Sequence, residues 1–188
     1  EDETLTAANT LADADGLGTI GYQWGRAGTA ITGETSSTYT LVQADVGSEI
    51  SVTASYTDGE GTAERVSSSA TSAVANVDDA AVITGDRSGT GEEDGGAITG
   101  TLSATDVDGL TDTTIYSVST EPSKGIATVD AASGEWSYTP NANTNGGDSF
   151  VITVTDDQNG STTEDVTITV NAVDDAPTGS VTISGTAT

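Results

Sequence analysis

The stretch FVITVTDDQNGSTTEDVTITV, residues 150–170, decides the fold. Apolar residues alternate with small polar ones in part of 150–155 and throughout 166–170, which predicts two strands that each bury one face. Between them Asn159-Gly160 is a strong turn signal, so the stretch predicts a β-hairpin. The segment ISVTASY, residues 50–56, alternates in the same way. No window has the 3.6-residue apolar period of a helix, and we expect essentially no helix.

Turn signals recur at short intervals along the rest of the chain. They are Asp15-Gly16, Asp58-Gly59, Asp108-Gly109, Ser133-Gly134 and Asn145-Gly146-Gly147. Short strands separated in this way are typical of antiparallel β-sandwiches. The predicted fold class is all-β, with two Greek-key sandwiches in tandem.

Composition limits the partners and the chemistry. The 188 residues carry 30 acidic and four basic side chains, a net charge of -26. Such a chain is not expected to bind nucleic acid or an anionic membrane, and no apolar run approaches the roughly 20 residues of a membrane span. There is no Cys and no His, so any bound metal takes oxygen ligands. No nucleophile has a base beside it, and we do not expect an enzyme.

The tetrapeptide VDDA marks the domain organisation, because it occurs at 77–80 and again at 173–176, each time after a Val-rich run. We expect a first unit at residues 1–76, a second at 77–175 and an opening strand of a further repeat at 176–188. The first unit then lacks a first strand of its own.

The first unit resembles an immunoglobulin-like sandwich. The resemblance rests on Tyr22-Gln23-Trp24 as a central strand and on the corner Asp45-Val46-Gly47 before the strand at 50–56. The disulfide of that fold is missing, so packing around Trp24 has to replace it.

The second unit carries Trp136-Ser137-Tyr138-Thr139-Pro140, Asp148-Ser149-Phe150 and the terminal D-D-A-P at 174–177, in that order. Over 82–177 this is similar to the cadherin-like, VCBS-type repeats of giant secreted bacterial adhesins of the RTX class. The resemblance implies a tandem array at the bacterial surface.

The two ends of the chain fit such an array. The tail SVTISGTAT (180–188) follows the second VDDA much as an opening strand follows the first, and Glu1-Asp2-Glu3 corresponds to Glu92-Glu93-Asp94. The chain therefore matches one period of a longer array, displaced by one strand from the fold. A loose strand and an open sheet edge favour strand addition, and we expect residues 176–188 to complete the first unit of another copy.

Acidic clusters recur at matching places in both halves, and calcium takes six to eight oxygen ligands. In the cadherin-like repeats that this chain resembles, calcium lies at the joint between consecutive domains. At the inner joint the resemblance implies a calcium site made of Asp58 or Glu60, Asp78, Asp79, Glu93, Asp94, Asp106 and Asp108. At the next joint it implies Asp156, Asp157, Asp174 and Asp175 with Glu1, Asp2, Asp13 and Asp15 of a following copy.

Other interpretations stay open. Asp-Gly is a common turn without any metal, and the acidity alone also fits a salt-adapted surface. Trp24 and Trp136 are either core residues or stacking platforms for glycans. The expected function is a calcium-rigidified extender of a secreted, surface-attached adhesin that serves attachment or biofilm formation. The alternative is a sandwich module that binds glycans or peptides.

Overall fold

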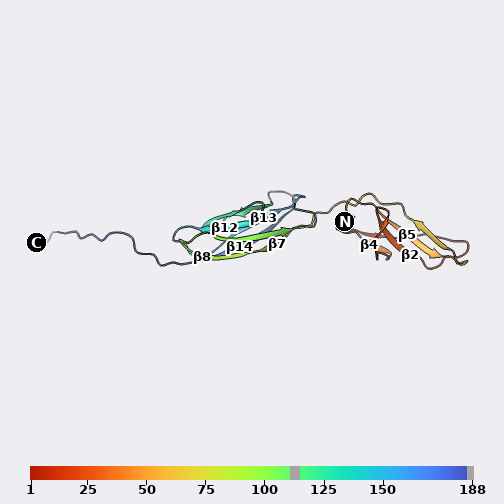
Figure 1. The fold of residues 1–188 in the computed structure, drawn as a ribbon, viewed down its shortest axis with the longest axis horizontal. Coiled ribbons are helices and arrows are strands. Elements are labelled where there is room, and N and C mark those ends of the chain that lie inside the picture. The colour runs from red at the N-terminus through yellow and green to blue at the C-terminus, as the bar shows by residue number, and fades with distance from the viewer. Residues whose placement is uncertain (111–114, 186–188) are drawn as a thin grey trace. The chain divides into compact units, whose positions relative to one another are not determined.

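The computed structural model describes residues 1–110 and 115–185 and divides into two compact units, Glu1–Asp78 and Asp79–Thr188 (Figure 1). Both are built from β-strands, and the helical structure of the described residues is one three-residue 3-10 helix, η1 (Gln43–Asp45). The predicted all-β fold with essentially no helix is confirmed. No described helix has the length and apolarity needed to cross a membrane.

Unit 1 contains a two-stranded sheet of order β1-β4 and a four-stranded sheet of order β3-β2-β5-β6. The strands are β1 (Thr4–Thr6), β2 (Gly21–Arg26), β3 (Thr29–Ala30), β4 (Thr38–Thr40), β5 (Ile50–Thr57) and β6 (Ala63–Ser67). β5 coincides with the alternating segment of the sequence and pairs with both β2 and β6.

Trp24 on β2 is the centre of the unit 1 core. It is 3% exposed, its ring lies 5.6 Å from that of Tyr39, and its Nε1 donates to the carbonyl of Ser36 at 2.9 Å. Leu41, Ile50 and Val74 complete the cluster of buried residues. Aromatic packing together with a satisfied indole N–H therefore holds the two sheets, in a chain that has no cysteine.

Asp45 adds a buried polar link to this core. Its carboxylate, 0% exposed, accepts hydrogen bonds from Arg26 Nε (2.6 Å), the Tyr39 hydroxyl (2.8 Å) and the main-chain N–H of Val42 (2.8 Å). Burial raises the pKa of Asp45, but the hydrogen bonds from Val42, Arg26 and Tyr39 outweigh it, and the pKa is lowered overall. The ionised form is thus bound at the corner that the sequence predicted between two strands.

Unit 2 is a fuller sandwich of two four-stranded sheets, of order β10-β13-β14-β8 and β11-β12-β9-β7. The strands are β7 (Val82–Gly85), β8 (Ser88–Glu92), β9 (Ile98–Thr105), β10 (Tyr116–Thr120), β11 (Gly125–Val129), β12 (Glu135–Pro140), β13 (Gly146–Thr155) and β14 (Ser161–Asn171). β13 and β14 form the predicted hairpin, and β8 pairs with β14 in parallel.

Trp136, Tyr138 and Phe150 occupy the middle of the unit 2 core, each at most 1% exposed. The ring of Phe150 meets Trp136 edge-on at 5.7 Å and stacks on Tyr138 at 6.4 Å. These residues come from both sheets, so their packing holds the sandwich together.

Asp148, on β13, links the loop between β10 and β11 to this core. Its oxygens accept hydrogen bonds from the main-chain N–H groups of Ser123 (3.1 Å) and Lys124 (2.7 Å) and from the Tyr138 hydroxyl (2.9 Å). Burial raises the pKa of the Asp148 carboxyl, but the hydrogen bonds from Lys124, Ser123 and Tyr138 outweigh it and lower the pKa to about 2. Burial and the bond to Asp148 together raise the pKa of Tyr138 to about 12.

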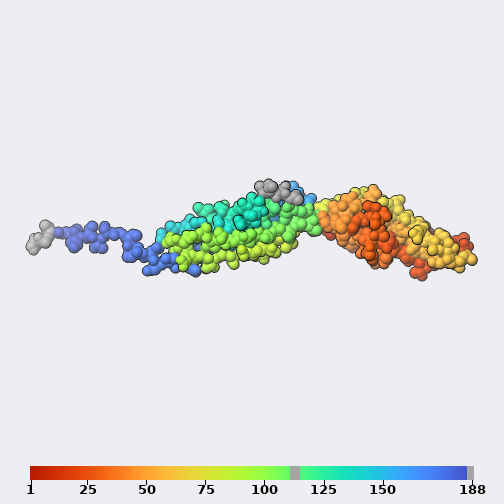
Figure 2. All heavy atoms as spheres, viewed as in Figure 1, coloured from red at the N-terminus to blue at the C-terminus, as the bar shows by residue number. Residues whose placement is uncertain are grey.

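Residues 172–185 contain no strand, and the blue spheres of Figure 2 show them uncovered by the rest of unit 2. Val181 is 99% exposed and Ile183 98%. The predicted opening strand is therefore unpaired within the described part of the chain. Residues 186–188 of that predicted segment lie outside the described residues.

Asp148→Asn is expected to lower the free energy of unfolding of unit 2 by about 2 kcal/mol at pH 7, because a depressed pKa stabilises the fold wherever the unfolded carboxyl is ionised. The stabilisation is present above the unfolded pKa near 3.9 and is lost as the pH falls towards 2. Urea unfolding followed by Trp136 fluorescence in a Trp24→Phe background, with chelator, measures this. The matched control is Asp165→Asn on the exposed side of β14, and an Asp148→Asn deficit that persists unchanged at pH 2 would contradict the assignment.

Candidate metal sites

One end of unit 1 gathers three aspartates, Asp13, Asp15 and Asp58. One carboxylate oxygen of each lies within 4.8 Å of the others. The D-x-D-G turn positions the first two, since the N–H of Asp15 donates to Oδ1 of Asp13 at 2.9 Å. Gly59 brings the hairpin between β5 and β6 against this turn: its N–H donates to the Asp15 carbonyl at 3.1 Å, and a Cβ there would lie 2.2 Å from that oxygen. Three carboxylates at this separation are a ligand set for a hard cation.

Asp58 also shapes its own hairpin. Its Oδ1 accepts hydrogen bonds from the main-chain N–H groups of Glu60 (3.0 Å) and Thr62 (2.7 Å). This is the turn-forming role that aspartate plays without metal. The same side chain therefore fixes the loop and presents its carboxylate to Asp13 and Asp15.

Unit 2 repeats the hydrogen bonds of these turns. The N–H of Asp108 donates to Oδ1 of Asp106 at 2.7 Å, and Oδ2 of Asp108 accepts from the N–H of Asp79 at 2.8 Å. At the hairpin between β13 and β14, Asp156 accepts from the N–H groups of Gln158 (3.0 Å) and Gly160 (2.8 Å), as Asp58 does in unit 1. Asp156 is 3% exposed.

Asp106 shows a feature that turn formation does not explain. Its Oδ2 is buried and has no hydrogen-bond partner among the described residues. A buried carboxylate oxygen without a partner is costly, and a cation at this position would satisfy it.

A glutamate occupies the opposite end of each unit. Glu93 is 4% exposed, and its carboxylate accepts hydrogen bonds from the N–H of Val173 (3.0 Å) and from Asn145 Nδ2 (3.1 Å). In unit 1, Glu1 accepts from the N–H of Val77 at 3.2 Å, and its own main-chain nitrogen donates to the carbonyl of Ala75. The glutamate thus holds the segment that leads into V-D-D in both units.

The next residues match as well. Asp2 and Asp94 both have the left-handed backbone conformation, with φ of 62° and 56°. Both side chains are exposed, as are Asp78, Asp174, Asp175 and Glu60, while Asp157 is partly buried.

The structure corrects the grouping expected in unit 1. Asp58 follows the last residue of β5, whereas the segment before Asp78 lies beside the start of β5, where Val74 N–H donates to the Ser48 carbonyl. Along a strand of this length the two ends are about 23 Å apart. Asp58 and Glu60 therefore do not share an end with Asp78, and that part of the prediction was wrong.

Unit 2 requires the same correction. Asn171, at the end of β14, pairs with Glu92, so Glu93 and Asp94 lie at that end. Asp106 and Asp108 follow β9 at the opposite end, where β7 begins. The hairpin with Asp156 and Asp157 is at the start of β14. It therefore lies at the end of Asp106 rather than with Asp174 and Asp175, contrary to the prediction.

The error has one physical cause, which is strand direction. A hairpin lies at whichever end its first strand runs towards, and the direction of β5 and β13 is decided by the tertiary pairing. The sequence also missed Asn145, which orients Glu93 and was predicted only as a turn residue; nothing in its local sequence distinguishes it.

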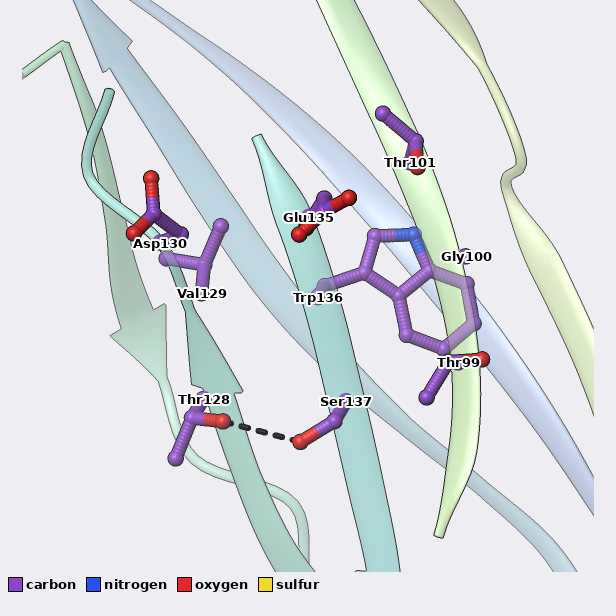
Figure 3. A pocket seen from close by; sticks show the side chains of 9 residues that line it. All are labelled: Thr99, Gly100, Thr101, Thr128, Val129, Asp130, Glu135, Trp136 and Ser137. Carbon is purple, nitrogen blue, oxygen red and sulfur yellow. Dashed lines mark hydrogen bonds between the residues drawn. The ribbon is translucent and has the colours of Figure 1, made fainter. Parts of the chain in front are cut away.

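The aromatic side chains that could have served for glycan stacking lie in the two cores. Trp24, Tyr116, Trp136 and Tyr138 are all at most 7% exposed, so none presents a stacking surface. A depression of about 590 Å³ lies beside Trp136. Figure 3 shows the side chains that line it, with the indole of Trp136 against Gly100. Hydroxyls such as those of Thr128 and Ser137, 2.9 Å apart, line it together with Asp130 and Glu135. It lacks the exposed aromatic ring that the glycan-binding alternative requires.

Unit 2 matches a known protein family. The family model of the bacterial cadherin-like domain matches residues 78–172, slightly more than half of the chain. The chain belongs to the bacterial cadherin-like family. No curated protein sequence matches this cadherin-like chain.

Several solved structures are similar to this chain at low sequence identity. The human desmocollin-1 ectodomain is 16% identical over 88% of this chain and 37% of its own (TM-score 0.39), and mouse cadherin-23 EC22-24 is 19% identical over 82% and 53% (TM-score 0.43). The D00-D0 domain of intimin is 15% identical over 89% and 93% (TM-score 0.36). The cadherin-like chain spans about half or less of the two cadherin structures.

Asp58→Ala is expected to lower the free energy of unfolding of unit 1 by about 1–2 kcal/mol in chelator, because two main-chain N–H groups lose their acceptor. Asp58→Asn retains an acceptor oxygen and should cost less than about 0.5 kcal/mol under the same conditions. Urea unfolding followed by Trp24 fluorescence in a Trp136→Phe background separates the two. Equal losses for both variants would show that the charge, not the turn, stabilises the hairpin.

Proposed function

We propose that this chain is a calcium-rigidified extender segment of a secreted bacterial surface adhesin of the RTX class. It would project a distal adhesive region for attachment or biofilm formation, and it would have no catalytic role. The observation that carries the proposal is the repetition, in both units, of the same hydrogen bonds to an Asp-x-Asp turn, a hairpin Asp and a Glu, with the carboxylates of Asp13, Asp15 and Asp58 close together in unit 1.

The proposed ligand sets follow this corrected arrangement. At each joint the upstream unit supplies its Glu and the first linker Asp, while the downstream unit supplies the second linker Asp, the Asp-x-Asp pair and the hairpin Asp. For the inner joint these ligands are Glu1, Asp78, Asp79, Asp106, Asp108 and Asp156. At the next joint they are Glu93, Asp174 and Asp175 with Asp13, Asp15 and Asp58 of a following copy.

Calcium would act by cancelling repulsion. Two carboxylates 4 Å apart repel by about 4 kcal/mol at an effective dielectric constant of 20. A divalent cation shared by ligands from two units converts this repulsion into a link that opposes bending at the joint. Because a secreted protein meets millimolar calcium only outside the cell, the same ions would couple rigidity and stability to export.

Calcium is expected to stabilise the chain selectively. At a concentration about 100 times the dissociation constant, one site adds about 2.7 kcal/mol, which raises the unfolding midpoint by roughly 10 °C or more. Differential scanning calorimetry in calcium, magnesium and chelator tests this. The double variant Asp106→Asn/Asp108→Asn should lose most of the rise, whereas Asp165→Asn should keep it. A rise of equal size in magnesium would contradict a calcium-selective site.

Rigidity is tested separately from stability. The chain has no cysteine, so Thr19→Cys in unit 1 and Thr163→Cys in unit 2, both exposed, can carry two spin labels. Calcium is expected to narrow the measured distribution of label-to-label distances, and magnesium to leave it broad. If calcium leaves the distribution of label-to-label distances unchanged, the chain is not a calcium-rigidified extender, even if it binds calcium.

A further inference from the structure

The chain enters and leaves unit 2 at opposite ends of the sandwich. β7 begins where Val82 pairs with Thr105, the last residue of β9. β14 ends at the other end, where Asn171 pairs with Glu92. A force applied through the segments before and after unit 2 is therefore directed along its strands.

β8 joins the entry side of unit 2 directly to the exit strand. It follows β7 after a short turn and lies parallel to the end of β14, with residues 88–92 opposite 167–171. Main-chain hydrogen bonds continue this ladder at both ends: the N–H of Thr167 donates to the Arg87 carbonyl at 3.0 Å, and the N–H of Glu93 donates to the Asn171 carbonyl at 2.9 Å.

Parallel pairing decides how this ladder responds to a force. The start of β8 points to the end where the chain enters, and the end of β14 points to the end where it leaves. An opposed pull slides the two strands past each other and loads all the ladder hydrogen bonds together. In an antiparallel pair the two pulled ends would lie side by side, and the bonds, each of them weak, would break one after another.

Side chains extend the contact beyond the ladder at both ends. Nη2 of Arg87 lies 3.1 Å from Oε2 of Glu164 on β14. The carboxylate of Glu93, which is 4% exposed, accepts hydrogen bonds from the N–H of Val173 at 3.0 Å and from Asn145 Nδ2 at 3.1 Å. The contact between the two segments is thus longer than the ladder itself.

β8 also lies directly against the core. A Cβ at Gly89 would lie 2.4 Å from Ile98 and 3.1 Å from Trp136, and one at Gly91 would lie 2.6 Å from Ile98. A side chain at either position would displace these core residues, so glycine allows the strand to lie this close. The core side chains therefore cover one face of the ladder and exclude water, which competes for its hydrogen bonds, from that face.

We propose that residues 87–93 and 164–173 form a load-bearing clamp, which resists extension of unit 2 until its hydrogen bonds break together. The inference rests on the proposed function, because an extender that holds an attached region is pulled from end to end. Unlike the proposed calcium at the joint, the clamp lies wholly within unit 2 and needs no ion.

Optical tweezers on the full chain, in chelator, test the clamp by changing only the direction of the pull. The chain has no cysteine, so pairs of exposed positions can be changed to cysteine and coupled to DNA handles. Ser88→Cys with Ala176→Cys pulls along the ladder, whereas Glu92→Cys with Ala176→Cys opens it from its last pair. Since forced unfolding is governed by the unfolding rate, the first combination is expected to need a force at least about twofold higher at the same loading rate.

A third combination separates the clamp from β7. Ala80→Cys with Ala176→Cys loads β7 before β8, and its highest unfolding force should equal that of Ser88→Cys with Ala176→Cys. A clearly higher force would assign the load to the pairing of β7 with β9 and overturn the proposal. Equal forces for the combinations with Ser88→Cys and Glu92→Cys would overturn it as well. All four positions are exposed, so each uncoupled variant should keep the wild-type midpoint of urea unfolding.

The clamp and the calcium-rigidified extender can fail independently. The force measurements contain no calcium, whereas the label-to-label distances are compared with and without it. A direction-dependent force in a chain whose distances calcium leaves unchanged supports the clamp and contradicts the proposed function. A force that does not depend on direction, in a chain that calcium stiffens, overturns the clamp alone.

Discussion

The interaction on which both units depend is the hydrogen bond from a main-chain N–H to an end carboxylate. Asp58 and Asp156 each accept from two N–H groups of their own hairpin, and Glu1 and Glu93 each accept from the N–H of the valine of V-D-D. In a chain without disulfides these bonds fix where the strands end. The same bonds orient carboxylates at both ends of each unit.

Different interactions stabilise the two units. Unit 2 has two complete sheets around Trp136 and Phe150, and it supplies its own covering strands β7 and β8. Unit 1 has the smaller core around Trp24 and adds the buried contact of Asp45 with Arg26 and Tyr39. Breaking a buried pair of this kind leaves an uncompensated charge, so the smaller unit tolerates change at its corner least.

Net charge and local geometry act on different scales. The charge of -26 keeps copies apart at long range and is screened within about 10 Å at moderate salt. The carboxylates at the ends of the units lie closer than that, where a cation changes the balance of forces directly.

Much of the fold could be predicted from side-chain pattern alone. The alternation at 50–56, 150–155 and 166–170 predicted strands that the structure contains as β5, β13 and β14. The prediction succeeded because the half-buried strand is the regular structure whose side chains alternate between two faces. The acidic turns were also identifiable, since Asp-Gly pairs determine their own local geometry. The sequence could not predict that Asn145 binds Glu93 or that Asp148 binds Tyr138, because these contacts join segments far apart in the chain.

By itself, then, the sequence determined the all-β class and the repeated acidic turns, both of which depend on neighbours within a few residues. The burial of the two tryptophans, which the sequence left open, was decided by the structure. Only the tertiary structure decided which carboxylates meet. Asp58 lies with Asp13 and Asp15 rather than near Asp78, and Asp156 lies at the end of Asp106 rather than that of Asp174. The reason is that the end of the sandwich reached by a hairpin is set by the direction of its strands in the sheet. That direction follows from pairing over the whole unit, which no local pattern encodes.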